Sequence, residues 1–175
     1  MTAISDLKEA VAEDPVYQGL KQAVETVQHS IDPKKILGEA KSLHETRKSR
    51  KLSTTAMSSM PLYEARMDEL KCRARLTTLR VAVIIEIRAL ETLQSKVKKH
   101  LHVKYAEYLA AWSNQSMRNQ VVDRIIAKSE EVLEDIKAVE EVLKYYIEDI
   151  DQAAFAIKGG EDTFKLFTER RDQMV

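Results

Sequence analysis

The strongest constraint on the fold is a seven-residue repeat of branched apolar residues in the C-terminal half of the chain. Ile136, Leu143, Ile150 and Ile157 lie seven residues apart. Neighbouring apolar residues widen this stripe, namely Val132, Leu133, Val139, Tyr146, Ile147 and Ala153. Seven residues make almost two turns of an α-helix, so these side chains fall on one side of it. The repeat predicts a long amphipathic helix that must bury its apolar side.

A second long helix is predicted from Pro61 to about Trp112, with either a continuous course or a break near His100. Its apolar residues also recur in heptads, interrupted by Gln94: Leu76, Leu79, Val83, Ile87, Leu90, Val97 and Leu101. The polar residues 113–119 predict a turn before the C-terminal helix. Gly159-Gly160 predicts the end of that helix, because glycine readily adopts the left-handed backbone of a helix C-terminus. A last short helix then follows, capped by Asp162 and bearing Phe164, Leu166 and Phe167.

Three shorter helices are predicted in the N-terminal region. Ser5 can cap a helix that ends near Ala12. Asp14-Pro15 and Asp32-Pro33 each combine a capping carboxylate with a proline at the first helical position, where no amide donor is needed. Residues 47–60 have a basic start, no helical period and several serines and threonines, which predicts a linker.

The composition agrees with an all-α chain. Its 175 residues include only four Gly and three Pro, and charged residues make up 32%. We therefore predict long antiparallel helices with a coiled-coil-like C-terminal helix and an N-terminal helical arm. The arm and basic linker are assigned to residues 1–60, and the long-helix core and oligomerisation domain to residues 61–175.

Several function classes lack support in the sequence. The uncharged runs of the long helices, such as residues 81–85, are far shorter than the roughly 20 residues that cross a bilayer, and no signal peptide is recognisable, so we expect a soluble, cytoplasmic protein. Cys72 is the only cysteine, which excludes an intramolecular disulfide and predicts a small buried hydrophobe. His100 and His102 point to different sides of a helix, and His29 and His44 lack nearby partners, so no metal site is expected.

No catalytic constellation is expected either. The acid pairs Glu130-Glu131 and Glu140-Glu141 have Lys137 and Lys144 as helical neighbours, which is typical of a solvated helix face. Gly159-Gly160 follows no strand and has no phosphate-loop pattern. We predict a protein that is not an enzyme and that uses no cofactor.

The main apolar stripe leaves two alternatives open. Ile136, Leu143, Ile150 and Ile157 either join copies of the chain or pack on the helix that begins at Pro61, and both can occur together. Ile at one heptad position and a wide flanking stripe favour an oligomer larger than a dimer, so we expect a homo-oligomer with these four residues at the interface.

The charges cancel overall but are sorted along the chain. Residues 34–104 contain seventeen Lys and Arg against seven Asp and Glu, while residues 119–163 contain five against twelve. A basic segment can neutralise phosphates and an acidic helix cannot. Any nucleic acid is therefore expected at the first segment, and other protein at the second.

Two groups of basic residues lie within that segment. Arg66, Arg73 and Arg80, with Lys71 and Arg75 beside them, are more typical of a solvated helix face than of a binding site. The denser group predicts a single-stranded nucleic-acid site and consists of Lys96, Lys98, Lys99, His102 and Lys104, with His100 among them. Tyr105, Tyr108 and Trp112 follow it, although the spacing of Tyr108 and Trp112 favours the core over a stacking role.

The C-terminal half resembles a known family. The segment Glu131-Val-Leu-Glu-Asp-Ile-Lys-Ala-Val-Glu-Glu-Val-Leu-Lys-Tyr-Tyr-Ile-Glu-Asp-Ile, then Phe155-Ala-Ile-Lys158 and Phe164-Lys-Leu-Phe167, is similar to the C-terminal end of the UvsY family, the recombination mediators of T-even-type phages. Val103-Lys-Tyr-Ala-Glu-Tyr108 is similar to that family's basic, tyrosine-containing segment. The likeness covers roughly residues 97–167, and residues 1–60 have no recognised counterpart.

The resemblance implies a non-enzymatic protein that forms a ring-like oligomer through its C-terminal helices. Such a protein binds single-stranded DNA and helps a recombinase displace the single-strand-binding protein, in the host cytoplasm if the chain is phage-encoded. By this resemblance, Lys104 corresponds to the family's basic segment that contacts DNA. The family tends to have more strong bases in that segment, so Lys98 and Lys99 would have to supply the missing positive charge. The alternative is a phage virion or assembly component that acts as a helical structural or adaptor protein.

Overall fold

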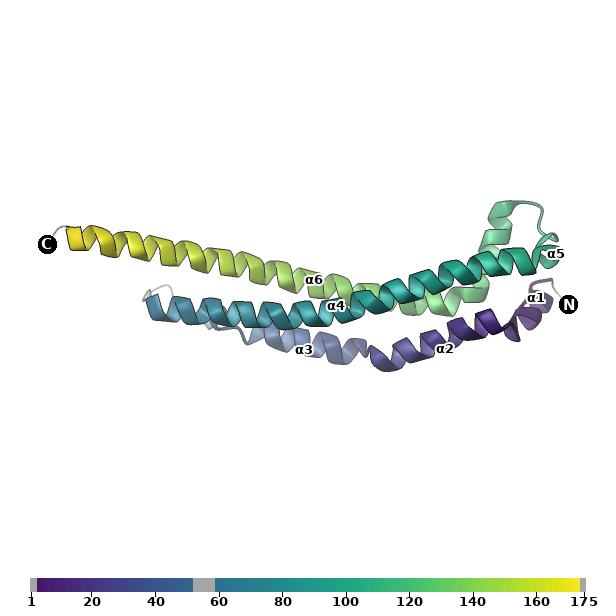
Figure 1. Ribbon diagram of the computed structural model, residues 1–175, viewed down its shortest axis with the longest axis horizontal. Coiled ribbons are helices and arrows are strands. Elements are labelled where there is room, and N and C mark those ends of the chain that lie inside the picture. The colour runs from purple at the N-terminus through teal and green to yellow at the C-terminus, as the bar shows by residue number, and fades with distance from the viewer. Residues whose placement is uncertain (1–2, 52–58, 174–175) are drawn as a thin grey trace. The chain divides into compact units, whose positions relative to one another are not determined.

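The chain is built from helices, as its sequence predicts. The computed structural model describes residues 3–51 and 59–173, and no strand occurs among them. The helices are α1 (Ala3–Ala12), α2 (Pro15–Ser30), α3 (Pro33–Glu45), the 3₁₀ turn η1 (Lys48–Lys51), α4 (Ser59–Lys104), α5 (Ala106–Leu109) and α6 (Gln115–Gln173) (Figure 1). None of the described helices is both long enough and apolar enough to span a membrane.

The chain divides into two compact units, each made from separate stretches of sequence. Unit 1 comprises residues 1–33 and 83–138, and unit 2 comprises residues 34–82 and 139–175. The long helices α4 and α6 contribute to both units. The predicted division of the chain near residue 60 stays a prediction.

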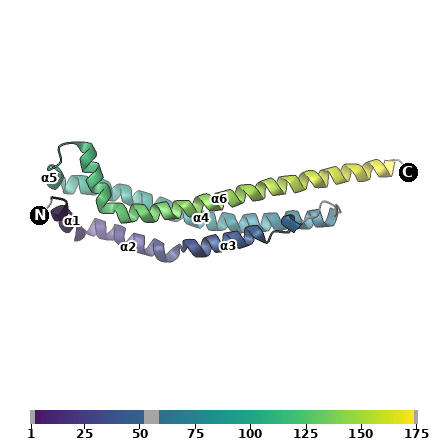
Figure 2. The same cartoon turned by 180° about the vertical axis from the view of Figure 1, so that it is seen from behind.

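In unit 1, α1 and α2 lie along the C-terminal part of α4 (Figures 1 and 2). The helix start predicted at Asp14-Pro15 is confirmed, since the Asp14 carboxylate accepts the amides of Val16 and Tyr17 at 2.8 and 3.3 Å. The buried apolar side chains of this unit include Leu7, Val11, Leu20, Val24, Leu90, Val97, Leu101, Val122, Ile126 and Ile136. Gln94, which interrupts the heptads, donates a buried hydrogen bond of 3.1 Å to Ser129 on α6. The polar interruption is therefore matched by a polar residue on the facing helix.

In unit 2, α3 begins at Pro33 as predicted, and the N-terminal part of α4 packs antiparallel on the C-terminal part of α6. The buried apolar side chains here include Ala40, Leu62, Ala65, Leu76, Leu143, Ile150 and Ile157. Cys72 is buried among them, as expected of a small hydrophobe.

The prediction that the C-terminal helix ends at Gly159-Gly160 is wrong, because α6 continues without a break to Gln173. Neither glycine adopts a positive φ. Just before them, Ile157 packs with Leu62 and Ala65 of α4, and the backbone of Gly160 lies next to Leu62. Glycine in a helix interior costs about 1 kcal/mol relative to alanine, which this packing on α4 outweighs. Asp162 consequently lies inside α6 and caps nothing.

Other predicted boundaries also differ from the structure. Ser5 caps no helix start, because α1 begins at Ala3. Of the two courses left open for the helix that begins near Pro61, the one with a break fits, since α4 stops at Lys104 and the single turn of α5 follows. α6 begins at Gln115, inside the predicted turn. The predicted linker begins with buried Arg47 and the turn η1, and its residues 52–58 lie outside the described residues.

Candidate nucleic-acid interface

The basic cluster at the end of α4 is divided by the structure into paired and unpaired residues. Lys98 is a paired one: its Nζ lies 2.8 Å from carboxylate oxygens of both Asp123 and Glu130 on α6. These hydrogen bonds raise the pKa of Lys98. Lys98 therefore joins α4 to α6 inside unit 1, and much of its charge is already neutralised.

Lys104 and His100 are paired with Asp14, the capping residue of α2. Asp14 is buried, and its Oδ2 accepts from Lys104 Nζ at 2.7 Å, His100 Nε2 at 2.9 Å and the Tyr105 hydroxyl at 3.1 Å. Burial acts to raise the pKa of Asp14, but the hydrogen bonds outweigh it and hold that pKa well below its usual range. Lys104 thus links the start of α2 to α4, although about half of its side chain is exposed. It is the residue that the resemblance matches to the family's DNA-contacting segment.

Lys96 and Lys99 behave differently. Both are exposed, and neither forms an ion pair with any residue that the structure describes. Arg88 shares these properties and was missed by the sequence analysis, which looked for local density. It lies eleven residues before Lys99, about three helical turns or roughly 16 Å along the same side of α4. We call Arg88, Lys96 and Lys99 the cationic row.

His102 lies at the edge of a shallow groove between α4 and α6 of unit 1. Side chains of both signs line this groove, among them Glu91, Lys98, Lys99, Glu130 and Lys137. Lys137 is itself bound to Glu91 at 3.0 Å. The groove is therefore close to neutral, and of the cationic row only Lys99 lines it.

The aromatic residues after the cluster are also divided. Tyr105 is buried, so its ring cannot stack on a base, and its single hydroxyl hydrogen is shared between Asp14 and the Ala10 carbonyl, 3.0 Å away. Tyr108, which the sequence placed toward the core, is 46% exposed and meets Tyr105 edge-on at 6.1 Å. Tyr108 is the residue of this pair whose ring is open to solvent.

The arginines spaced by heptads on α4 are 32–45% exposed, in keeping with a solvated face, but each is also ion-paired. Arg66, Arg73 and Arg80 contact carboxylates of α6, namely Glu161 at 2.9 Å, Asp151 at 2.5 Å and Glu140 at 2.6 Å. The partners run backwards along α6, as antiparallel packing requires. These three ion pairs, which we call the arginine ladder, bind the two helices of unit 2 together and leave those cations less available to a polyanion.

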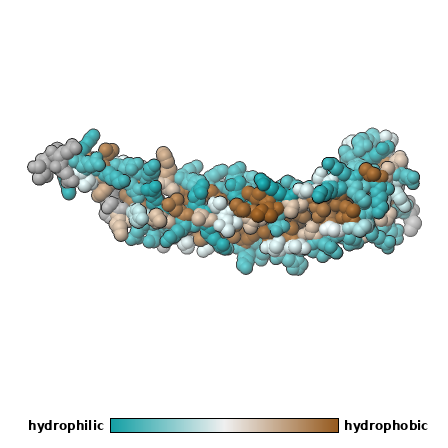
Figure 3. Space-filling model, in the orientation of Figure 1, coloured by the Kyte–Doolittle hydropathy of each residue, from teal (hydrophilic) through white to brown (hydrophobic). Residues whose placement is uncertain are grey.

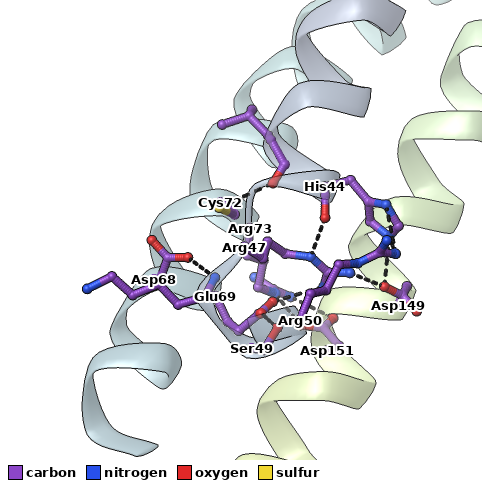
Figure 4. Close-up of polar contacts among 12 residues, drawn as sticks. His44, Arg47, Ser49, Arg50, Asp68, Glu69, Cys72, Arg73, Asp149 and Asp151 are labelled. Atoms are coloured by element: carbon purple, nitrogen blue, oxygen red, sulfur yellow. Dashed lines mark hydrogen bonds and ion pairs between the residues drawn. The ribbon is translucent and has the colours of Figure 1, made fainter. Parts of the chain in front are cut away.

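Unit 2 also contains a buried polar cluster around Arg47 (Figure 4). Its Nη1 donates to Glu69 at 3.0 Å, its Nη2 to Asp149, and its Nε to the His44 carbonyl at 2.9 Å. The Arg47 side chain is 2% exposed and that of Glu69 is fully buried. His44, for which the sequence offered no partner, contacts Asp149 at 2.8 Å.

The other members of this cluster are also stacked or hydrogen-bonded. The His44 ring stacks on Tyr146 with centroids 4.4 Å apart, and Ser49 donates to Glu69. Among the described residues, no buried side-chain nitrogen or oxygen lacks a hydrogen-bond partner, and no group of three or more His, Cys, Asp or Glu is placed to hold a metal ion. With its donors and acceptors engaged, the cluster is a clamp that holds the segment after α3 against α4 and α6.

The residues expected at a subunit interface lie in the core of the single chain. Ile136 is buried in unit 1, and Leu143, Ile150 and Ile157 are buried in unit 2. Packing within the chain, the alternative left open by the sequence, accounts for their burial. Association through these four residues stays a prediction, and it would require the present packing to be exchanged for packing between copies.

No family model, curated protein or solved structure matches this chain. The resemblance to the UvsY family consequently rests on the sequence segments described above.

Proposed function

We propose that this chain is a non-enzymatic, mediator-like protein that binds single-stranded DNA and assembles as a homo-oligomer to load a recombinase. The observation that carries the proposal is the cationic row, because Arg88, Lys96 and Lys99 are exposed and lack ion-pair partners among the described residues. The sequence resemblance adds the recombinase and the single-strand-binding protein as partners. The proposed place of action is the cytoplasm, that of the host cell if a phage encodes the chain.

The row would hold DNA by its phosphates. Cations that neutralise phosphates release condensed counterions, and this supplies affinity without reading the sequence. Contacts of this kind leave the base edges free, which suits a strand that must be passed to a recombinase. Three contacts per chain give weak binding, so several copies acting together are needed to hold a strand firmly.

A binding titration tests this proposal. The variant Arg88→Ala, Lys96→Ala, Lys99→Ala removes the row without removing an ion pair, and alanine preserves helix propensity. We expect its affinity for a labelled oligothymidylate at low salt, measured by fluorescence anisotropy, to fall by roughly tenfold or more. The control Lys8→Ala, Lys158→Ala, Lys165→Ala removes the same charge from exposed positions elsewhere and should bind like the parent.

Substitution of the predicted set as a whole would be a poorer experiment. The sequence suggested that Lys96, Lys98, Lys99 and Lys104 could all become alanine without harm to the fold. However, Lys98 is bound to Asp123 and Glu130, and Lys104 to buried Asp14. Loss of DNA binding in that variant would mix lost contacts with a weakened unit 1.

A structural or adaptor protein is the second candidate function. An observation in unit 2 favours it, because large apolar side chains on the N-terminal part of α4 are exposed, including Met60, Tyr63 and Leu70. Such a surface is typical of protein contacts and not of DNA contacts. If the parent chain binds no single-stranded oligonucleotide at low salt, the adaptor function replaces the mediator function.

A further inference from the structure

The N-terminal part of α4 in unit 2 carries two apolar sides, and the chain itself covers one of them. Leu62, Ala65, Cys72 and Leu76 are buried against the rest of unit 2. The other side presents a second heptad pattern, which we call the exposed stripe: Met60, Tyr63, Met67, Leu70, Ala74, Thr77 and Val81. Its large members are between 38% and 63% exposed. Hydrophilic residues cover most of the face seen in Figure 3, and apolar residues emerge between them.

The spacing of the exposed stripe matches what a partner helix requires. Its residues are alternately three and four positions apart over three heptads. This is the spacing of the side chains that occupy the two core positions of a coiled coil. Scattered exposed apolar residues are ordinary, but a continuous row of them at this spacing marks an interaction surface.

Charges beside the stripe indicate which partner fits. Glu64 and Lys71 lie on the same flank, seven residues apart, and both are exposed. Glu64 also binds Lys48 of its own chain at 3.0 Å, in a pair about half exposed that leaves room for a second cation. Suppose that a second copy packs antiparallel so that Met67 of the first copy faces Leu70 of the second. Tyr63 of the first copy then faces Ala74 of the second, and Met60 faces Thr77. The large side chains of one helix then face smaller ones of the other. In this register Glu64 meets Lys71 of the second copy, and the two-fold axis repeats the contact.

A parallel second copy fits less well. It would gain no ion pair, because Glu64 would have no cation of the second copy opposite it and Lys71 would lie near Arg66. The other flank of the stripe carries the arginine ladder, and the antiparallel arrangement would bring Arg66 near Arg73 of the second copy. Both arginines are already bound to carboxylates of α6, so the contact between Glu64 and Lys71 decides between the two arrangements. The flank charges therefore favour the antiparallel arrangement.

We propose that the exposed stripe on α4 of unit 2 is an interface between two copies of this chain, paired antiparallel with Glu64 opposite Lys71. This inference rests on the self-association included in the proposed function and names where the copies meet. It does not depend on DNA binding, so the two can fail separately.

Sedimentation velocity of the full-length chain tests the interface. Leu70→Lys places a charge in the stripe at an exposed position, so the fold should survive, as circular dichroism would show. We expect self-association to weaken by roughly a hundredfold, because a buried unpaired charge is costly. The control Phe155→Lys alters an apolar residue that is 79% exposed on α6 and should leave association unchanged.

A charge exchange tests the register. Glu64→Lys and Lys71→Glu should each weaken association by roughly tenfold, since each places like charges opposite one another. The double variant should recover the affinity of the parent. A double variant as weak as the single ones would overturn the antiparallel register, and a parent that stays monomeric up to roughly 100 μM would overturn the interface. Because several copies together hold a strand, the Leu70→Lys chain should also bind the labelled oligothymidylate more weakly than the parent. Sedimentation without DNA decides the interface, and the oligonucleotide titration of the parent chain decides the DNA site, so the two failures are distinguishable.

Discussion

In unit 1 the solvent side of α4 presents Arg88, Lys96 and Lys99, whereas in unit 2 it presents Met60, Tyr63, Met67 and Leu70. Both units contain basic residues on this helix, but those of unit 2 are largely bound to acids of α6 or α3. The arginine ladder is one example, and Arg75, bound to Glu39 at 2.6 Å, is another. The difference indicates that a surplus of basic residues along a segment overstates the positive charge available to a partner. The proposed DNA site therefore rests on the cations that lack acidic partners among the described residues.

The two units are similar in how their short N-terminal segments are fastened. Each uses one charged residue with a buried side chain: Asp14 at the start of α2 in unit 1, and Arg47 before η1 in unit 2. Asp14 receives its donors mainly from α4, whereas Arg47 is bound to carboxylates of both α4 and α6. Arg47 contacts more elements than Asp14 does, and its partner Glu69 is buried with it. Loss of the Arg47–Glu69 ion pair should therefore lower the free energy of unfolding more than loss of the Asp14 contacts.

The largest expected effect is therefore in unit 2. Glu69→Ala leaves the Arg47 guanidinium buried with Asp149 as its one remaining carboxylate. Removing one partner of a buried ion pair destabilises by about 3–5 kcal/mol, and we expect a loss of that size in the free energy of unfolding measured with urea.

The matched control is Asp151→Ala, on α6 of the same unit. Asp151 binds Arg73 at 2.5 Å with both side chains nearly half exposed, and exposed pairs contribute about 0–1 kcal/mol. Equal losses in the two variants would remove the distinction between a buried clamp and a surface pair.

A smaller effect is expected at the corresponding residue of unit 1. Asp14→Asn preserves a capping side chain but removes the negative charge that Lys104 and His100 contact, so we expect a loss of about 1 kcal/mol at neutral pH. Because the pKa of Asp14 is lowered on folding, its contribution is present above the ordinary pKa of an aspartate and is lost as pH falls below about 4.

Urea unfolding at a series of pH values checks this sign. The parent chain should lose stability between about pH 4 and pH 2 more steeply than Asp14→Asn, which has no proton to gain at this site. Asp149, whose pKa is also lowered by its hydrogen bonds to Arg47 and His44 against the effect of burial, should keep some acid sensitivity in both chains. Identical pH profiles would mean that Asp14 is not held as a paired carboxylate.

The sequence predicted those features that depend on neighbouring residues. The helix starts at Pro15 and Pro33 follow from a local cap and a proline, and the long helices α4 and α6 follow from heptads. The helix end expected at Gly159-Gly160 also rested on local preference, and it was wrong because packing on α4 outweighed that preference.

The features that escaped prediction depend on residues far apart in the chain. Arg47 meets Glu69 22 residues later and Asp149 102 residues later, so nothing in its local sequence indicated burial. In the same way, the basic cluster looked uniform in sequence, and acids on α2 and α6 divide it into paired and unpaired members. Arg88 would have been found by asking which cations lie three helical turns from Lys99.

The most direct test of the cationic row is the salt dependence of oligonucleotide binding. Each phosphate neutralised on a single strand contributes a slope of roughly 0.7 to the logarithmic dependence of affinity on salt, so three contacts contribute roughly 2 per bound chain. We predict that the Arg88→Ala, Lys96→Ala, Lys99→Ala variant loses about that much slope, while the Lys8→Ala, Lys158→Ala, Lys165→Ala control retains it. An unchanged slope in the first variant, or a parent chain that binds no single strand at low salt, would contradict the account.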